Sequence, residues 1–476
     1  MSNLNLFWHR RDLRINDNIG LYSAYLTSKK IIACYCLDPV IFDSDQIAPA
    51  KVTYLLESLQ ELQENYRKLK SELYILQGKP EQIIPQFAQS LNIKSVYYNL
   101  DVEPYSKERD QKVTEALKEK GIETKSYWDQ LLHNPTEIFS KSKTPYTIYT
   151  PYWKNWQQQI KPISMENINK FEPLTETEKE LIKNTNIINL PTAKELGFIW
   201  DQPLFLSAGE KVAHDQLEYF CNNLIEQYQE QRDFPAIEGT SRLSSAINLG
   251  VISIRKIWQS SVKMMEYCRS DESRNNILTW QKELAWREFY QQALYHFPEL
   301  TKGAFREPFK NFPWDNNREY FEAWCEGKTG YPIVDAAMRE LNETGWMHNR
   351  CRMIVASFLT KDLIIDWRWG EEYFMKTLID GDLSANNGGW QWSASSGMDP
   401  KPLRIFNPAS QSQKFDPEGE YIRLWVKEIS SLDTVELVTG KIPELTCYHC
   451  GYTTPIVDHK IQQQTFKERY KLQKLC

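Results

Sequence analysis

The first part of the chain alternates between short apolar runs and longer amphipathic stretches. Apolar runs at residues 6–8, 31–37, 73–76 and 95–98 predict buried strands. Between the second and third runs, residues 52–69 place apolar side chains on one helical face and polar side chains opposite. Strands and helices in alternation predict a doubly wound parallel sheet covered by helices. Ligands of such a sheet gather at the carboxyl ends of its strands.

The pattern changes twice further along the chain. Residues 144–209 lack a clear period and contain six prolines, which indicates a long connector wrapped on the surface. Beyond it, helical periodicity dominates to about residue 440 and strand signals fade. We therefore expect an α/β domain at 1–132, a connector at 133–208 and a larger all-α domain at 209–476.

Composition narrows the class of protein. A net charge of −6 argues against a basic coat, so any nucleic-acid contact would rest on a local patch. Nine cysteines scattered over 476 residues do not resemble a disulfide framework, and the cytoplasm is the expected location. No apolar run is long enough for a signal peptide or a membrane span. Cys447, Cys450 and His459 in the tail are poor evidence for zinc, and we expect no metal.

Aromatic and polar side chains are concentrated in the second half. Eleven of the sixteen tryptophans lie between Trp258 and Trp425. Residues 380–392 combine two carboxylates, adjacent asparagines, three glycines and two tryptophans. Asn and Gly favour turns, but large indoles rarely follow a solvated turn. This stretch predicts a turn whose backbone approaches a flat ligand.

The segment 280–290 places four functional side chains at helical spacing. Glu283, Trp286, Arg287 and Tyr290 fall at i, i+3, i+4 and i+7, so a helix would gather them on one face. A buried carboxyl beside an indole would favour its protonated form and could donate a proton or hydrogen bond. Taken alone, the segment fits a Glu283–Arg287 surface pair beside a core tryptophan better than a functional site.

Three further motifs allow both a functional and a structural interpretation. Asn349 and Met353, at i and i+4, fit a substrate wall or a helix cap and core. Hydroxyls in residues 239–244 fit a phosphate at a helix start or ordinary capping. His9 fits local packing and ion pairing at the end of the first strand better than catalysis.

Together, these segments resemble the photolyase/cryptochrome family over nearly the whole chain. The resemblance rests on Phe-Trp-His-Arg-Arg-Asp-Leu-Arg at the start, Thr-Ser-Arg-Leu-Ser, Glu-Leu-Ala-Trp-Arg-Glu-Phe, Thr-Gly-Tyr-Pro-Ile-Val-Asp-Ala-Ala-Met-Arg, Gly-Trp-Met-His-Asn-Arg and the stretch 380–392, in that order. Within the family, the chain looks most like class I cyclobutane pyrimidine dimer photolyases with a deazaflavin antenna.

The resemblance implies a helical domain that holds a folded, reduced FAD. Asn386 would face flavin N5, and Arg352 would pair with Asp380 near the isoalloxazine. The full set that it implies for FAD is Tyr228, Thr240, Ser241, Arg242, Leu243, Ser244, Arg287, Arg352, Asp380, Gly381, Asp382 and Asn386.

The same resemblance implies a pocket for a dimer flipped out of single- or double-stranded UV-damaged DNA. Excited FADH⁻ would pass an electron to the dimer, the ring bonds would break, and the electron would return, with no net redox change. Trp390, Trp367 and Trp314 would relay electrons from the surface to oxidised flavin. The residues implied for lesion and DNA are Arg232, Glu283, Trp286, Tyr290, Asn349, Arg350, Met353, Trp392 and Gln411.

An antenna pigment is implied in the first domain. The resemblance places 8-hydroxy-5-deazaflavin near Cys36, Asp38, Lys51, Asp101 and Glu103, at the strand ends. Methenyltetrahydrofolate, or no second pigment, is the alternative. No membrane and no obligate protein partner are expected, and the chain is expected to be a monomer.

Three rival functions are weighed against dimer repair. A signalling cryptochrome would fit poorly with Glu283, Asn386 and the lack of a long polar tail after the helical region. A (6-4) photolyase would be expected to carry two histidines where this chain has Asn349 and Met353. A plain flavin oxidoreductase lacks support because no nicotinamide motif is present.

Overall fold

A six-stranded sheet forms the centre of the N-terminal region. The computed structural model describes residues 4–43, 45–398 and 403–475. Its strand order is β5-β4-β1-β2-β3-β6, and β1 to β5 run parallel while β6 is antiparallel to β3. The strands are β1 (Asn5–His9), β2 (Ile31–Leu37), β3 (Leu73–Gln77), β4 (Ser95–Asn99), β5 (Glu123–Tyr127) and β6 (Ile187–Ile188).

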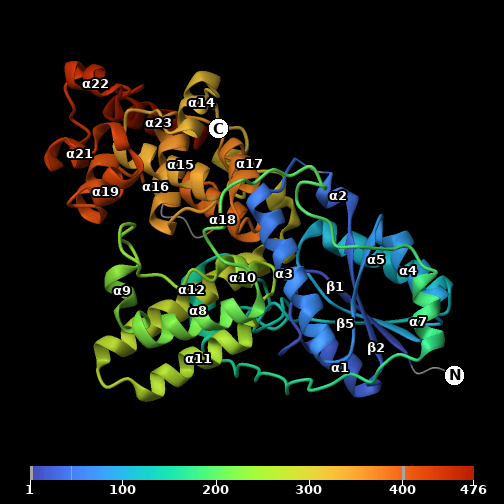
Figure 1. Ribbon diagram of the computed structural model, residues 1–476. Coiled ribbons are helices and arrows are strands. Elements are labelled where there is room, and N and C mark those ends of the chain that lie inside the picture. Colours follow the sequence, from blue (N-terminus) through green and yellow to red (C-terminus); the bar gives the residue numbers. More distant parts are fainter. Residues whose placement is uncertain (1–3, 44, 399–402, 476) are drawn as a thin grey trace.

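Helices cover both faces of this sheet (Figure 1). On one side lie α1 (Ile19–Thr27) and α3 (Pro49–Lys68), and on the other α4 (Pro80–Ser90) and α5 (Pro104–Glu119). Successive strand residues face opposite sides, so Phe7 and Trp8 belong to two different cores. The short helix α2 (Pro39–Phe42) follows β2. The predicted doubly wound α/β architecture is confirmed.

Two strands and two helices were not predicted. β5 has the polar sequence Glu-Thr-Lys-Ser-Tyr, and no apolar run marks it because it is an edge strand held by pairing with β4. The connector also contains α6 (Tyr149–Trp156), α7 (Glu176–Lys183) and β6. The connector is therefore not simply a surface loop, since it adds a strand to the sheet and buries Trp156.

The second half is helical, as expected, and holds no strand among its described residues. Its elements are α8 (Glu210–Asn223), η1 (Ile225–Gln227), α9 (Tyr228–Gln231), α10 (Ser244–Asn248), α11 (Ile254–Tyr267), α12 (Asp271–His296), η2 (Pro298–Thr301), α13 (Glu307–Lys310), α14 (Arg318–Glu326), α15 (Pro332–Thr344), α16 (Asn349–Lys361), α17 (Trp367–Thr377), α18 (Leu383–Ala394), α19 (Pro408–Phe415), α20 (Glu420–Trp425), η3 (Lys427–Ile429), α21 (Thr434–Thr439), α22 (Glu444–Cys450) and α23 (His459–Gln473).

The sheet and part of the helical region share one continuous core. Side chains beneath α1 and α3 join those of α8 and α12 in a single apolar cluster. Arg255 of α11 is fully buried and bonds Asp17 and Asp129 of the N-terminal region at 3.0 and 2.8 Å. These contacts fix the two regions against each other. Within the described residues, no helix has the length and apolar character needed to cross a membrane.

Candidate functional site

A cavity of about 370 Å³ opens between α12, α16 and α18 in the helical region. The segment between α17 and α18 closes one side. A cavity of this size and mixed lining suits an organic ligand. Its walls contain Arg232, Glu283, Trp286, Arg287, Tyr290, Asn349, Arg352, Met353, Ala356, Phe374, Leu378, Asp380, Gly381, Asp382, Ala385, Asn386, Gly389, Trp390, Trp392 and Ser393.

Helix α12 supplies the four side chains that the sequence spacing placed on one face. Glu283, Trp286, Arg287 and Tyr290 all line the cavity, so this prediction is confirmed. The alternative Glu283–Arg287 surface pair is wrong. Glu283 accepts a hydrogen bond from Arg232 Nη1 at 2.6 Å, and Arg287 Nη1 donates to the Gln130 carbonyl at 2.9 Å.

The surroundings of Glu283 differ from the expected ones. Its side chain is 33% exposed, and one carboxylate oxygen is occupied by the hydrogen bond from Arg232. The deep burial expected for this carboxyl is therefore not found. A ligand that binds at this position would have to exclude water from the Glu283 carboxyl.

The indole of Trp286 is fixed by the connector. The Tyr149 ring of α6 stacks on it with centroids 3.6 Å apart and an interplanar angle of 8°. Tyr149 Oη also donates to the Lys282 carbonyl at 2.7 Å, which holds the ring against α12. Sequence analysis missed this residue, and only the aromatic residues clustered at 146–156 hinted at it.

Helix α16 starts at the cavity mouth. His348 caps it, because its Nδ1 accepts a hydrogen bond from the Arg350 amide at 3.2 Å. The helix cap is therefore not Asn349, which is exposed and lines the cavity with Met353. The Asn349 amide lies 3.9 Å from Met353 Sδ.

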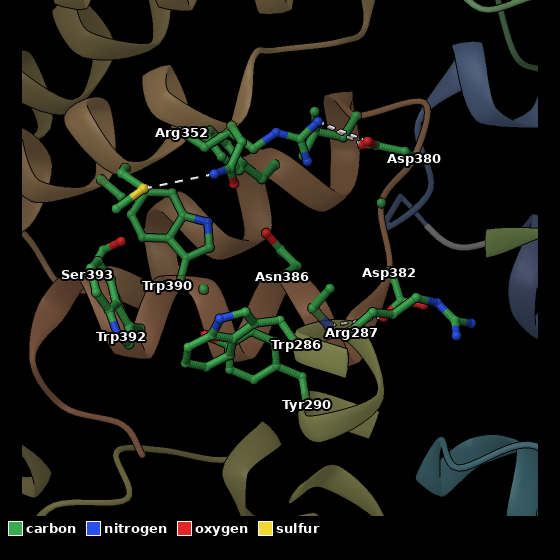
Figure 2. A pocket seen from close by; sticks show the side chains of 18 of the residues that line it. Trp286, Arg287, Tyr290, Arg352, Asp380, Asp382, Asn386, Trp390, Trp392 and Ser393 are labelled. Carbon is green, nitrogen blue, oxygen red and sulfur yellow. Dashed lines mark hydrogen bonds and ion pairs between the residues drawn. The ribbon is translucent and has the colours of Figure 1, made fainter. Parts of the chain in front are cut away.

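Arg352 ties α16 to the segment before α18. Its Nη2 lies 3.1 and 2.9 Å from the two carboxylate oxygens of Asp380, and its Nε donates to the Met347 carbonyl. Figure 2 shows this pair at one side of the cavity and Trp286 with Tyr290 at the opposite side, with Asn386 projecting into the space between them.

Residues 383–394 form helix α18, so the expected turn is wrong. Asp382 caps the helix by accepting a hydrogen bond from the Ala385 amide at 2.9 Å. The glycines inside the helix serve different needs. A methyl group on Gly388 would sit 2.2 Å from a Tyr290 ring carbon, so this position brings α18 close to α12. A methyl group on Gly389 would meet no described residue within 4 Å, because this position lines the cavity.

The orientation of Asn386 is set by α17. Its Nδ2 donates to the Glu371 carbonyl at 2.9 Å, which leaves Oδ1 available to the cavity. The Glu371 carboxyl accepts a hydrogen bond from Asn387 Nδ2 at 2.8 Å, and burial raises its pKa to about 7. Glu371 was not among the predicted residues, because its role depends on packing between two helices.

Charged groups at the inner end of the cavity are held in place. Burial opposes ionisation of Asp382, but Arg11 and Arg287 outweigh it and lower its pKa. Burial also lowers the pKa of Arg287, whose Nη2 is buried without a hydrogen-bond partner among the described residues. A ligand with carbonyl or anionic oxygen atoms would satisfy this nitrogen.

Several sequence-predicted residues do not line this cavity. Tyr228 lies behind Arg232, whose guanidinium carbon is 5.3 Å from the centre of its ring. Arg350 pairs with Asp233 at 2.8 Å, and Gln411 belongs to α19. Residues 240–243 precede the short α10, which begins at Ser244, and Arg242 has a positive φ of 51°.

Two of the three tryptophans of the predicted relay are deeply buried, and the third is partly buried. Trp390 lines the cavity and is 2% exposed, and Trp367 is equally buried in the same apolar cluster. Trp314 is partly buried, with its ring centroid 4.5 Å from that of Phe312. Trp390 also contacts Trp324, which was not predicted, at a centroid distance of 6.1 Å.

A second cavity of about 280 Å³ lies at the carboxyl ends of β1, β2 and β4. All five residues predicted for an antenna line it: Cys36, Asp38, Lys51, Asp101 and Glu103. Burial raises the pKa of the Cys36 thiol to about 12 and that of Glu103 to about 7. His9, also in this wall, contacts Asp12 and donates to or accepts from Tyr66 Oη at 2.7 Å.

The tail residues serve the fold. His459 begins α23 and pairs with the buried Asp362, while Cys447 packs in the apolar cluster of α15 and α16. The described residues hold no group of three or more side chains suited to bind a metal.

Comparison with known proteins gives consistent matches over nearly the full length. Residues 5–175 match the family described as DNA photolyase, and residues 280–472 match the FAD binding domain of DNA photolyase. The chain is 53% identical over 465 residues to the deoxyribodipyrimidine photo-lyase of a Synechococcus strain, covering 98% of this chain and 96% of the relative.

Two solved structures share the fold. A bacterial class III photolyase from Agrobacterium tumefaciens matches with a TM-score of 0.89 and 32% identity, over 100% of this chain and 98% of the other. An archaeal photolyase from Sulfolobus tokodaii with two FAD molecules matches with a TM-score of 0.83 and 32% identity, over 98% of this chain and 100% of the other.

Proposed function

The chain belongs to the photolyase/cryptochrome family, and we propose that it uses FAD and light to split cyclobutane pyrimidine dimers in DNA. The observation that carries the proposal is one cavity with two kinds of wall. Charged and amide groups line its inner end, and two indoles with an amide and a carboxylate line its mouth. Such a cavity can hold a cofactor and a flat lesion in contact.

The inner wall fits the isoalloxazine of FAD. Asp382 carries a stabilised negative charge, Arg287 offers an N–H that has no partner among the described residues, and Asn386 presents Oδ1 to the cavity. When bound, reduced FAD supplies an electron after absorbing a blue or near-ultraviolet photon. Asn386 would accept a hydrogen bond at N5, and the Arg352–Asp380 pair would fix the same edge. Tyr228 and residues 240–244, which lie outside this cavity, would hold the ribose and phosphates.

The mouth fits a dimer taken out of the DNA helix. The two fused pyrimidines stack poorly in duplex DNA, so flipping them out costs less than flipping normal bases. Trp286 and Trp392 would form the apolar walls beside Met353. Glu283 and Asn349 would hydrogen-bond the polar edges, and groups that bond the lesion more strongly as it gains charge speed its cleavage.

The rim of the mouth carries the cations that would contact DNA phosphates. Arg232 lies beside Glu283, and Arg350 lies 4.2 Å from the centre of the Phe415 ring. Because overall charge is −6, these local cations and Gln411 would supply the contacts. Binding to DNA should weaken as salt rises.

Electrons for reducing the cofactor would enter through tryptophans. Trp314, in contact with Phe312 at the edge of the helical region, would be the outer member, followed by Trp367 and the cavity residue Trp390. The burial of the indoles supports Trp314 as the outer member, because Trp314 is partly buried while Trp367 and Trp390 are each 2% exposed.

A light-harvesting pigment would occupy the second cavity, as the class I resemblance implies. Its lining contains the five expected residues, and Sulfolobus photolyase is described with a second FAD as a novel light-harvesting cofactor. We propose 8-hydroxy-5-deazaflavin, with methenyltetrahydrofolate as the alternative. The absorption spectrum of the purified protein distinguishes them, because deazaflavin would add a strong band in the blue that reduced FAD lacks.

The repair reaction is tested by illuminating the reduced protein with an oligonucleotide that contains one thymine dimer. We expect the wild type to restore two thymines, and Glu283→Ala to repair at least about tenfold more slowly with FAD still bound, since a charged hydrogen bond is lost. Glu272→Ala, on the exposed start of α12, is the matched control and should repair normally.

Two results would change the assignment. Absence of repair by a reduced, FAD-loaded wild type would refute the proposed photolyase activity and favour a function in light signalling. Normal repair by Glu283→Ala would leave the reaction but remove Glu283 from the lesion contacts.

A further inference from the structure

The two cavities share one thin wall. Gly381, in the segment between α17 and α18, lines both of them. From the side of the second cavity, Lys51 Nζ donates to the Gly381 carbonyl at 2.5 Å. Asn248 Nδ2 donates to the same carbonyl at 3.2 Å and to Asp382 Oδ2 at 3.2 Å. In the proposed function this backbone faces FAD, and Lys51 and Asn248 hold it by hydrogen bonds from the opposite side.

One guanidinium spans this wall. Arg11, just after β1, bonds Asp382 through Nη2 and Glu103 through Nη1, the latter at 2.5 Å. Its Nε donates to the Asn248 carbonyl at 3.0 Å. Asp382 lines the first cavity and Glu103 the second, so Arg11 is shared between a carboxylate of each.

The charged groups around Arg11 affect the strength of its contact with Asp382. Asp101, Glu103 and Asp382 surround it, and the Lys51 ammonium lies close enough to interact with Arg11, Glu103 and Asp382. The side chains of Arg11 and Asp382 are only 17% and 9% exposed, so water screens their interaction weakly. A change at Glu103 or Lys51 therefore alters how firmly Arg11 holds Asp382.

We propose that Arg11 is a positioning residue for the cofactor-facing segment, and that through it a ligand in the second cavity tightens the binding of FAD in the first. The inference rests on the proposed function, because it assumes that the first cavity takes FAD. The ligand of the second cavity would be a planar aromatic molecule with polar edge groups. By excluding water around Glu103 and Lys51, it strengthens the Arg11–Asp382 contact. Linkage requires that FAD tightens the binding of that ligand by the same factor.

The neighbouring arginine provides a matched control. Arg10 also lines the second cavity, but it pairs with Asp110 and lies 4.8 and 4.7 Å from the rings of Trp8 and Tyr98. Among the described residues, no hydrogen bond or ion pair joins it to Gly381 or Asp382. Replacing it disturbs the second cavity without loosening the shared wall.

The experiment compares wild type, Arg11→Gln and Arg10→Gln. Equilibrium dialysis of each holoprotein gives the dissociation constant of FAD, with and without saturating 8-hydroxy-5-deazaflavin as the probe. We expect Arg11→Gln to weaken FAD binding by about tenfold, as for the loss of a charged hydrogen bond, and Arg10→Gln to leave it within about twofold. Deazaflavin should tighten FAD binding to the wild type by about fivefold or more, and to Arg11→Gln hardly at all.

Arg11→Lys is a second variant that keeps the test valid if Arg11→Gln fails to fold. Lysine keeps the charge but can bond only one of the two carboxylates well, so the effect of deazaflavin on FAD should still be lost. Equal FAD binding by wild type and Arg11→Gln, or an undiminished deazaflavin effect in Arg11→Lys, would overturn the inference. A wild type that binds no FAD would instead refute the proposed function.

Discussion

Adjacent glycines in α18 differ in what an added methyl group would meet. In Gly388→Ala the new carbon would lie 2.2 Å from the Tyr290 ring, and overpacking of this kind costs about 1–3 kcal/mol. In Gly389→Ala the methyl group has open space, and the better helix propensity of alanine should add up to about 1 kcal/mol. Urea unfolding of the flavin-free proteins measures both changes. Equal effects at the two positions would contradict the close approach of α12 and α18.

For individual residues, the sequence predicted some side chains of the site but not the residues that contact them. The i, i+3, i+4, i+7 spacing identified the cavity face of α12, since helical geometry alone brings these residues together. Arg232 and Glu283 are 51 residues apart, and Tyr149 reaches Trp286 from the connector. No local pattern records such contacts, because they depend on how distant segments pack.

The elements show why local propensity misled the prediction at 380–392. Asn-Asn-Gly-Gly favours a turn in isolation, but Asp382 caps the segment and packing against α12, α16 and α17 makes it a helix. The strands β1 to β4 and helix α3 were predictable because each carries its own apolar pattern. β5 is mostly polar and β6 has only two residues, so neither carries a recognisable strand pattern, and both form by pairing with neighbouring strands.

Helix α16 depends on a histidine cap, which makes its stability sensitive to acid. Burial lowers the pKa of His348 from 6.5 to about 4, so the unfolded chain takes up this proton at higher pH than the native chain. Stability is therefore lost as pH falls from 6.5 towards 4, by about 2 kcal/mol at pH 5.

The variant His348→Asn tests this dependence, because asparagine can cap a helix and does not titrate in this range. Unfolding free energies from urea titrations at pH 7 and pH 5 should fall less in the variant than in the wild type. An identical fall in both proteins would show that the cap does not contribute to acid sensitivity.

For the whole molecule, a buried ionic cluster joins the two regions. Arg255→Ala would leave Asp17 and Asp129 buried without their partner, and loss of one member of such a cluster costs about 3–5 kcal/mol. Lys112→Ala removes an exposed ion pair with Glu108 and should leave the unfolding midpoint unchanged. The thermal unfolding midpoints of the two variants measure this difference, and only Arg255→Ala should lower the midpoint. A small effect of Arg255→Ala would mean that the shared apolar core alone holds the regions together.

The antiparallel strand β6 has a consequence for synthesis of the chain. It covers the edge of β3, yet it is made roughly a hundred residues later, which corresponds to about 5–20 s of translation. During that interval the nascent sheet exposes an apolar strand edge that can pair with another chain. Fragments that end before residue 187 would keep this edge open permanently, so they should aggregate more readily than the full chain.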